Sequence, residues 1–233
     1  MRTSVVTLEV ERGLHDVGYT RVGGVDEVGR GAPAGPVCVG VVVVEPTVTR
    51  SLEGVADSKL LSPSKREALV PRIREWSSEW AVGFASAHEV DLLGLTGALR
   101  CAGLRALAQL ATPLDVVLLD GSHDWLTPRT HTELFAEPAP EFVAIPRVVT
   151  RVKADLSCAS VAAASILAKV ARDDVMRSLA REHPEFQWQL NKGYATAAHW
   201  QALRERGPTK YHRRSWHLPA GSEDQTTWST SGK

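Results

Sequence analysis

Two adjacent acids, Asp26 and Glu27, stand at the end of a short apolar run and are followed closely by Gly29, Arg30 and Gly31. Adjacent carboxylates repel each other, so a fold that brings them together usually places a cation between them. Oxygen ligands of this kind suit Mg²⁺ or Mn²⁺ better than zinc. Glycines let the backbone approach a ligand closely, and an arginine can grip a phosphate. The stretch favours metal-assisted chemistry on a phosphodiester, although such acid pairs also occur on ordinary surfaces.

Two further acids stand at positions that suit ligand binding. Asp120 follows the apolar run 116–119, and Asp155 comes just before a long stretch with helical periodicity. In open α/β sheets ligands bind beyond the carboxyl ends of the strands, and a helix N-terminus favours an anion. Asp120 with its following glycine is also a common turn pair, and an acid before a helix can be only a cap. From spacing alone, both interpretations of each acid stay open.

The hydrophobic pattern predicts the elements that must position these acids. It predicts strands over residues 22–28, 37–44, 80–85, 116–119 and 142–149. It predicts helices over residues 8–15, 62–76, 87–110, 160–181 and 197–206. The short Gly/Pro-rich link 29–36 favours an antiparallel first pair of strands. Gly94 and Gly97 predict a break in the third helix, and Pro146 predicts that the last strand lies at a sheet edge.

Composition limits the class of protein without identifying it. The chain has 233 residues, 43% of them hydrophobic, which is enough for a sizeable core. It shows neither a signal-peptide core nor an apolar run of the ~18 residues that a membrane span needs. Its three cysteines are far apart and predict buried, reduced thiols. We therefore expect a cytoplasmic protein without membrane contact. The formal net charge is zero, but a basic cluster between residues 204 and 214 could bind phosphates.

Seven stretches, taken together and in this order, resemble the type 2 ribonucleases H. They are GVDEVGRGAPAGP (24–36), DSKLLS (57–62), LLDG (118–121), KAD (153–155), AAASILAKVARD (162–173), KGYAT (192–196) and HRRSW (212–216). The resemblance implies an α/β fold of the ribonuclease H type, with a five-stranded mixed sheet flanked by helices. It also implies a catalytic domain over residues 1–182 and a helical, substrate-binding C-terminal lobe over residues 183–216. We expect residues 217–233 to form a disordered tail.

The resemblance further implies the activity and its metal. A member of this family hydrolyses the RNA strand of RNA/DNA hybrids and cuts 5′ of single ribonucleotides in duplex DNA, which leaves 3′-hydroxyl and 5′-phosphate ends. By position, the family's catalytic, metal-binding acids match Asp26, Glu27, Asp120 and Asp155. Mg²⁺ or Mn²⁺ is the implied cofactor, with two ions in the substrate complex. Because neighbouring strand residues point to opposite faces, Glu27 can share this site only where its strand ends or bulges. We expect a monomer.

Substrate contacts are implied at a second set of residues. The family's loop that reads the ribonucleotide 2′-hydroxyl matches Gly29, Arg30 and Gly31. A tight turn would also use both glycines, but the family match favours the functional role. The family's tyrosine at the RNA–DNA junction matches Tyr194, whose polar neighbours favour a surface-facing ring over a core one. Weaker candidates for phosphate contacts are Lys59, Ser165 and Lys169.

The sequence departs from the family pattern in one place. Gly94 stands where many members carry Asn, and Thr96 replaces a usual aliphatic residue, which affects the packing of that helix but not the chemistry.

Two rival functions stay open. One rival is another metal-dependent nuclease of the same fold, such as a junction resolvase. The other is a non-catalytic module that binds hybrids, which would bind a duplex in Mg²⁺ without cutting it.

Overall fold

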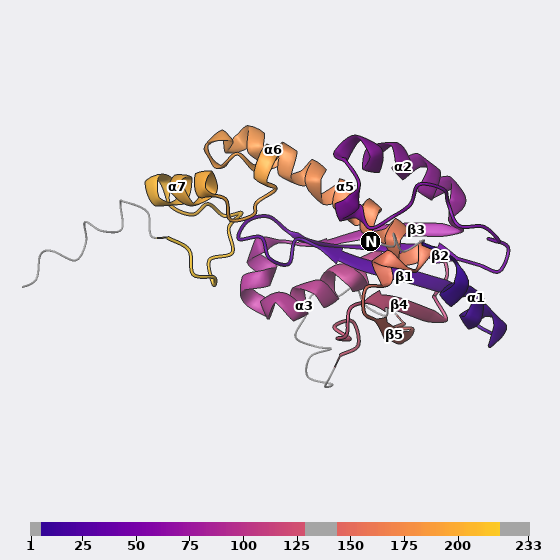
Figure 1. The fold of residues 1–233 in the computed structure, drawn as a ribbon. Helices are drawn as coiled ribbons and strands as arrows, with labels where there is room; N and C mark the ends of the chain where they lie inside the picture. The colour runs from indigo at the N-terminus through magenta and orange to yellow at the C-terminus, as the bar shows by residue number, and fades with distance from the viewer. Residues whose placement is uncertain (1–5, 129–143, 220–233) are drawn as a thin grey trace, which may run out of the picture.

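The computed structural model describes residues 6–128 and 144–219. Its strands are β1 (Val22–Val28), β2 (Val37–Val44), β3 (Glu79–Ala85), β4 (Val116–Asp120) and β5 (Arg147–Arg151). Its α-helices are α1 (Glu9–Asp16), α2 (Pro63–Trp76), α3 (Ala87–Leu107), α5 (Ala159–Glu182), α6 (Trp188–Asn191) and α7 (Ala197–Arg206) (Figure 1). Short 3₁₀ helices are η1 (Ser58–Leu60), η2 (Ala154–Leu156) and η3 (Pro184–Phe186).

The strands form one mixed sheet in the order β3-β2-β1-β4-β5. Strand β1 pairs antiparallel with β2 and parallel with β4, and β4 pairs parallel with β5. The β-branched run that predicts the second strand forms β2, which is buried at every position because helices cover both faces of the sheet. The predicted fold class, an α/β fold with a five-stranded mixed sheet flanked by helices, is confirmed.

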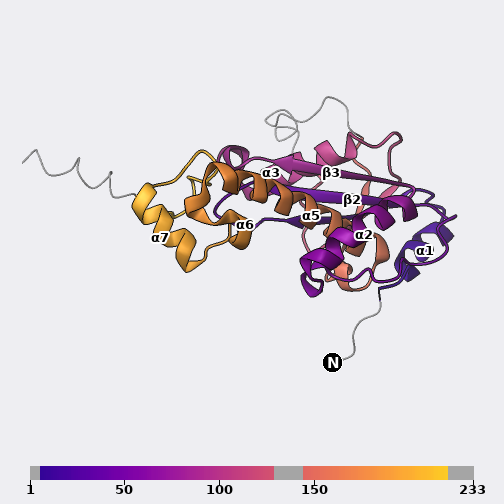
Figure 2. The same cartoon turned by 90° about the horizontal axis from the view of Figure 1, so that it is seen from above.

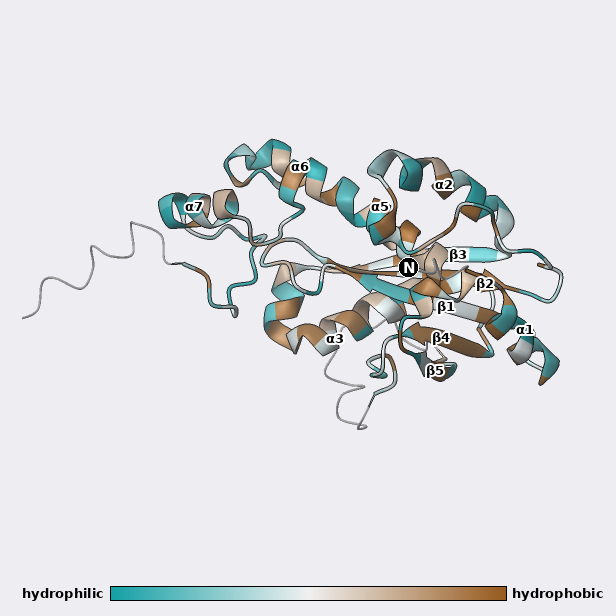
Figure 3. Ribbon diagram, viewed as in Figure 1, coloured by the Kyte–Doolittle hydropathy of each residue, from teal (hydrophilic) through white to brown (hydrophobic). Residues whose placement is uncertain are grey.

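Helix α3 packs on one face of the sheet, against β2 and β3, whereas α5 packs on the opposite face, against β1 and β2, with α2 beside it (Figures 1 and 2). Apolar residues gather along the strands and the inner sides of the helices, as Figure 3 shows. The approach of α5 to the sheet requires small residues, since a Cβ on Gly40 would lie 2.4 Å from the carbonyl oxygen of Ala164. The core therefore holds the sheet, with β1 in its centre, between two layers of helix.

Residues 183–216, which we call the C-terminal lobe, contain η3, α6 and α7 and lie beyond one end of the sheet (Figure 2). Their apolar side chains, among them Phe186, Trp188 and Leu203, form a separate cluster. The cluster also includes Met176 of α5 and Ala34 of the loop between β1 and β2. The lobe is thus packed directly against the segment that follows the first two acids, and its substrate-binding role stays a prediction.

Two predicted element boundaries are wrong. Strand β5 begins at Arg147, so Pro146 precedes the strand instead of interrupting it, although the predicted edge position is correct. Helix α3 ends at Leu107, three residues earlier than predicted. The predicted break near Gly94 and Gly97 is confirmed, since the backbone leaves the helical conformation at Gly94 (φ 69°, ψ 172°). Residues 142 and 143 of the predicted strand, and the predicted tail from residue 220, lie outside the described residues.

The cysteine and membrane predictions concern the rest of the molecule. Cys38, Cys101 and Cys158 are free and buried, as predicted. No helix within residues 6–128 or 144–219 is long and apolar enough to cross a lipid bilayer.

Candidate active site

Asp26 lies on β1. Val25, the residue before it, packs into the apolar cluster on the face of the sheet that α3 covers. Because successive strand residues point to opposite faces, the side chain of Asp26 points toward α5. Its side chain is buried, and Oδ1 accepts a hydrogen bond from the backbone N–H of Glu27 at 2.8 Å. Burial, followed by the negative charges of Glu27 and Asp120, raises the pKa of Asp26 to about 8. A carboxyl group in these surroundings would be ionised more readily beside a cation.

Glu27 lies one residue before the end of β1. The pairing with β2 stays regular, with Asp26 opposite Gly40 and Glu27 opposite Val39, so the strand does not bulge here. Oε1 of Glu27 accepts a hydrogen bond from Arg30 at 2.8 Å. Oε2 is buried and has no hydrogen-bond partner among the described residues. A buried, unpaired carboxylate oxygen close to a second acid is a suitable donor atom for a cation.

Asp120 and Asp155 lie near each other at the carboxyl end of β4. Oδ1 of Asp120 accepts a hydrogen bond from the N–H of Ala154 at 2.7 Å, which ties the strand to η2, where Asp155 lies. Burial, then the charges of Asp120 and Asp57, raise the pKa of Asp155. Nζ of Lys59 lies 3.7 Å from Oδ2 of Asp155. The structure therefore brings all four predicted acids into one electrostatically coupled group.

The donor set of this group fits a hard divalent cation, since it consists of carboxylate oxygens that repel one another. The four side chains do not converge on a single point. In the part of the chain that the structure describes, no three His, Cys, Asp or Glu side chains are arranged so that they could hold a metal ion. The role of the four acids as metal ligands stays a prediction.

The loop after β1 is held from inside the protein by Arg213. The fully buried guanidinium donates to the carbonyl oxygens of Gly29 at 2.6 Å, Arg30 at 2.8 Å and Gly35 at 3.3 Å. Gly29 adopts φ +91°, a conformation that favours glycine. Within the described ranges, the backbone N–H groups of Arg30 and Gly31 have no hydrogen-bond acceptor. The loop can therefore offer amide donors to a ligand.

Tyr194 lies in the C-terminal lobe and is 37% exposed as a residue, in agreement with the predicted surface position. The ring centroid lies 5.6 Å from the guanidinium carbon of Arg172. Arg172 also donates hydrogen bonds to the carbonyl oxygens of Ala34, Pro36 and Lys192. This one buried side chain thus connects the loop after β1 with the segment that carries Tyr194. The role of Tyr194 at a junction stays a prediction.

Comparison with known proteins shows to which family this chain belongs. The family model of ribonuclease HII matches residues 23–218. The chain belongs to the ribonuclease HII family. A ribonuclease HII from Streptomyces avermitilis is 45% identical over 211 residues, which cover 90% of this chain and 83% of that one. The chain is therefore an RNA-cleaving nuclease, a ribonuclease H enzyme.

Solved structures agree with the ribonuclease HII assignment. The crystal structure of ribonuclease H2 from Pyrococcus horikoshii is 25% identical and superposes with a TM-score of 0.61, over 84% of this chain and 94% of that one. Bst ribonuclease HIII in complex with Mn²⁺ superposes with a TM-score of 0.60 at 21% identity, over 87% of this chain and 69% of that one. The second likeness shows the fold alone.

Two of the weaker phosphate candidates of this ribonuclease HII are engaged within the protein. Ser165 is buried, lies 2.7 Å from the hydroxyl of Ser58 and contacts the carboxyl group of Asp26. It is placed to hold that acid and does not face solvent. Nζ of Lys169 lies 2.7 Å from Oδ1 of Asp173. Lys59 is the exposed candidate of the three, with 79% of its side chain accessible. Phosphate contacts of all three stay predictions.

Three residues near the candidate site, Asp57, Arg172 and Arg213, were not predicted from the sequence. Asp57 adds a fifth charge beside Asp155, and its place in the motif DSKLLS was a usable signal. Arg172 and Arg213 sit among charged residues in the sequence, which is typical of a solvated surface. Nothing in the sequence alone marks them as buried. Their roles follow only from the meeting of segments far apart in the chain.

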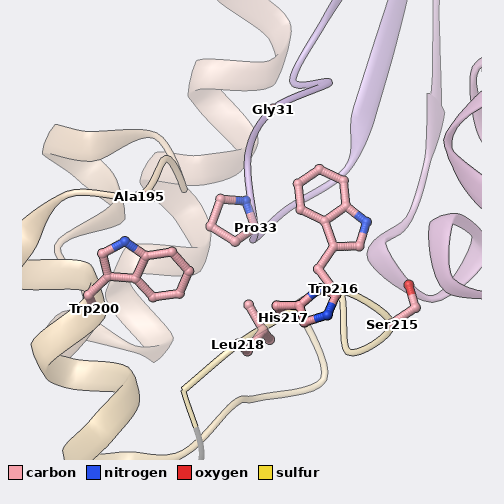
Figure 4. A pocket seen from close by; sticks show the side chains of 8 residues that line it. All are labelled: Gly31, Pro33, Ala195, Trp200, Ser215, Trp216, His217 and Leu218. Carbon is pink, nitrogen blue, oxygen red and sulfur yellow. The ribbon is translucent and has the colours of Figure 1, made fainter.

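A pocket of about 460 Å³ opens beside the loop of this ribonuclease HII (Figure 4). Gly31 and Pro33 line one side, and the C-terminal lobe lines the other with the indole rings of Trp200 and Trp216. None of the four acids lines this pocket. It adjoins the candidate active site and does not contain it.

Proposed function

We propose that this ribonuclease HII is a metal-dependent endonuclease that hydrolyses the RNA strand of RNA/DNA hybrids. It also cuts on the 5′ side of single ribonucleotides within duplex DNA, and its products carry 3′-hydroxyl and 5′-phosphate ends. The observation that carries the proposal is the coupled group of four acids, in which Asp26 and Asp155 are buried and the pKa of Asp26 rises to about 8. Acids held this close together without a cation destabilise their own ionised forms. The group is suited to binding a cation in the working enzyme.

Asp26, Glu27, Asp120 and Asp155 would hold Mg²⁺ or Mn²⁺, with two ions in the substrate complex. Divalent ions in such a site supply an activated water and stabilise the charge that develops on the reacting phosphate. The protein orients the carboxylates through main-chain donors, the N–H of Glu27 for Asp26 and the N–H of Ala154 for Asp120. We assign no side chain as general base.

Recognition of ribose is assigned to the loop Gly29–Gly31 and to Tyr194. The 2′-hydroxyl is the group that distinguishes RNA from DNA at a given sugar. The unpaired N–H groups of Arg30 and Gly31 support a main-chain contact to this hydroxyl. The half-exposed side chain of Arg30, which pairs with Glu27 in this structure, would be free to approach a phosphate if Glu27 held a cation. Tyr194 packs on the sugar at the junction, and the C-terminal lobe binds the duplex.

The test uses an end-labelled DNA duplex with one ribonucleotide, an all-DNA duplex of the same sequence, and a four-way DNA junction. Each is incubated with Mg²⁺, with Mn²⁺ and with a chelator. A single metal-dependent cut 5′ to the ribonucleotide, with the other two substrates intact, supports the proposal. Cleavage of the junction alone would favour the resolvase alternative. Binding of the ribonucleotide duplex without any cleavage would favour a non-catalytic module.

A further inference from the structure

Two histidines of the C-terminal lobe, His199 and His212, are almost completely buried, and their Nε2 atoms lie 3.0 Å apart. Nδ1 of His199 lies 2.9 Å from the carbonyl oxygen of Tyr194. Nδ1 of His212 lies 3.0 Å from the backbone nitrogen of Thr209 and 3.0 Å from its hydroxyl oxygen. The indole N–H of Trp188 donates to Nε2 of His199 at 3.2 Å. The proposed function uses none of these four side chains.

The fixed donors around the pair determine where its protons lie. A backbone N–H and an indole N–H can only donate, so Nδ1 of His212 and Nε2 of His199 must accept. His212 then carries its proton on Nε2 and donates it to His199, and His199 carries its proton on Nδ1 and donates to Tyr194. Every ring nitrogen is satisfied while both rings are neutral. The other groups whose charges act on His212 are His183 and Arg214, and both disfavour a positive ring.

The pair joins two segments that each carry a predicted substrate contact. The carbonyl oxygen of Tyr194 accepts hydrogen bonds from His199 and from the N–H of Thr196, which fixes the main chain that directs the exposed ring. His212 forms a backbone bridge with Ala34, within the loop that begins at Gly29. The hydrogen bond between the two histidine side chains therefore links the segment of Tyr194 with the segment of His212, which pairs with the loop after β1.

We propose that His199 and His212 are positioning residues for Tyr194. The neutral pair sets where the tyrosine ring stands relative to Gly29–Gly31, and so it sets the efficiency of cleavage at an RNA–DNA junction. Neither histidine touches substrate. The inference rests on the proposed function, because it specifies how the junction contact is held in register with the loop that reads the 2′-hydroxyl.

The test compares two replacements of one histidine. His212→Gln keeps an oxygen that accepts from Thr209 and an amide that donates to His199, whereas His212→Leu removes both. We measure kcat and KM on a duplex with one ribonucleotide and on a uniform RNA/DNA hybrid. For His212→Leu we expect kcat/KM on the single-ribonucleotide duplex to fall about tenfold more than on the hybrid. His212→Gln should stay within about threefold of the wild-type value on both substrates.

A control variant makes the same His-to-Leu replacement at a hydrogen-bonded histidine far from the C-terminal lobe. Nδ1 of His15 lies 2.9 Å from the carbonyl oxygen of Tyr19, on α1 at the opposite end of the molecule (Figure 1). His15→Leu should leave the ratio of the two substrates unchanged. Combining His212→Leu with Tyr194→Ala should add no further loss on the single-ribonucleotide duplex, because a residue that acts through Tyr194 has nothing left to position.

Equal losses on both substrates, or losses that add fully to those of Tyr194→Ala, would overturn the inference. If His212→Leu does not fold, ¹⁵N spectra of the wild-type histidine rings replace it. They should show a proton on Nδ1 of His199 and on Nε2 of His212, and the reverse tautomers would refute the network. A wild-type enzyme that cuts neither substrate would refute the proposed function itself. Wild-type cleavage with the wrong variant pattern would refute only the positioning role.

Discussion

Asp26 carries the sharpest prediction at the scale of single residues. Asn at this position keeps an oxygen that can accept from the N–H of Glu27 but removes the charge that would bind a cation. We expect Asp26→Asn to keep the fold and duplex binding and to lose cleavage by at least about 100-fold. Single-turnover cleavage and fluorescence anisotropy measure the two properties. The exposed Asp16→Asn serves as control, and an Asp26→Asn enzyme with a tenth of wild-type activity would remove Asp26 from the metal site.

The same residue makes the stability of the metal-free protein depend on pH. The pKa of Asp26 is raised from 3.8 to about 8 in the folded protein, so the folded state holds a proton that the unfolded chain has released. The stabilisation from this proton is fully present below pH 3.8, the pKa of Asp26 in the unfolded chain, and is lost as pH rises through about 8. Between pH 6.5 and 8 we expect the free energy of unfolding to fall by about 2 kcal/mol at most. Urea titrations in a chelator measure it, and Asp26→Asn should show a smaller fall.

Spacing indicated Asp26 and Glu27, and the family resemblance was needed to add Asp120 and Asp155, but neither predicted what holds these acids. Asp26, Glu27, Asp120 and Asp155 stand at strand ends or before a helix, and the structure brings them together. The contacts that fix their neighbours were not predictable, because a buried arginine such as Arg213 looks like any surface arginine until its carbonyl partners are known. Pattern shows where a charge lies along the chain, and only folding shows what surrounds it.

Among the elements, the contact between β2 and α5 is the most sensitive to a small change. A Cβ on Gly40 would lie 2.4 Å from the carbonyl oxygen of Ala164. Neither atom can turn aside, because one is a backbone atom and the other is bonded directly to the backbone. We expect Gly40→Ala to destabilise the protein by about 1–3 kcal/mol, because the helix must move off the sheet. Gly13→Ala in α1 is the matched control, since nothing lies within 4 Å of its Cβ. Gly13→Ala should raise the free energy of unfolding by up to about 1 kcal/mol. Equal unfolding midpoints for the Gly13→Ala and Gly40→Ala proteins would contradict the predicted clash.

Most elements were predictable because periodicity and turn residues agree with each other. Helix α7 begins at Ala197 and ends at Arg206, as predicted, since Thr196 caps it and Gly207 follows it. Strand β5 was misplaced because the edge strand is short and only partly buried, so its hydrophobic signal is weak. The positions of the elements relative to one another came from the family resemblance and could not be derived from propensity.

Considered as a whole, the molecule has a second titration that opposes that of Asp26. Burial, then the charges of His199, His183 and Arg214, lower the pKa of His212 to about 3. The stability that its neutral form contributes is present above about pH 6.5 and is lost as pH falls toward 3. Relative to His212→Gln, the wild-type protein should lose a few kcal/mol between pH 6.5 and 4. Denaturant midpoints of both proteins across this range measure it, and parallel curves would be evidence against a buried neutral ring.

The break at Gly94 lets one helix serve two parts of the molecule. Asp91, on the turns before the break, accepts hydrogen bonds from the N–H groups of Arg214 and Ser215 and from the Ser215 hydroxyl. The turns after the break are packed under the sheet. Gly94 adopts φ 69° and ψ 172°, a region open almost only to glycine. Helix α3 therefore consists of two helical segments joined at a glycine. The first segment is hydrogen-bonded to the C-terminal lobe through Asp91, and the second belongs to the core under the sheet.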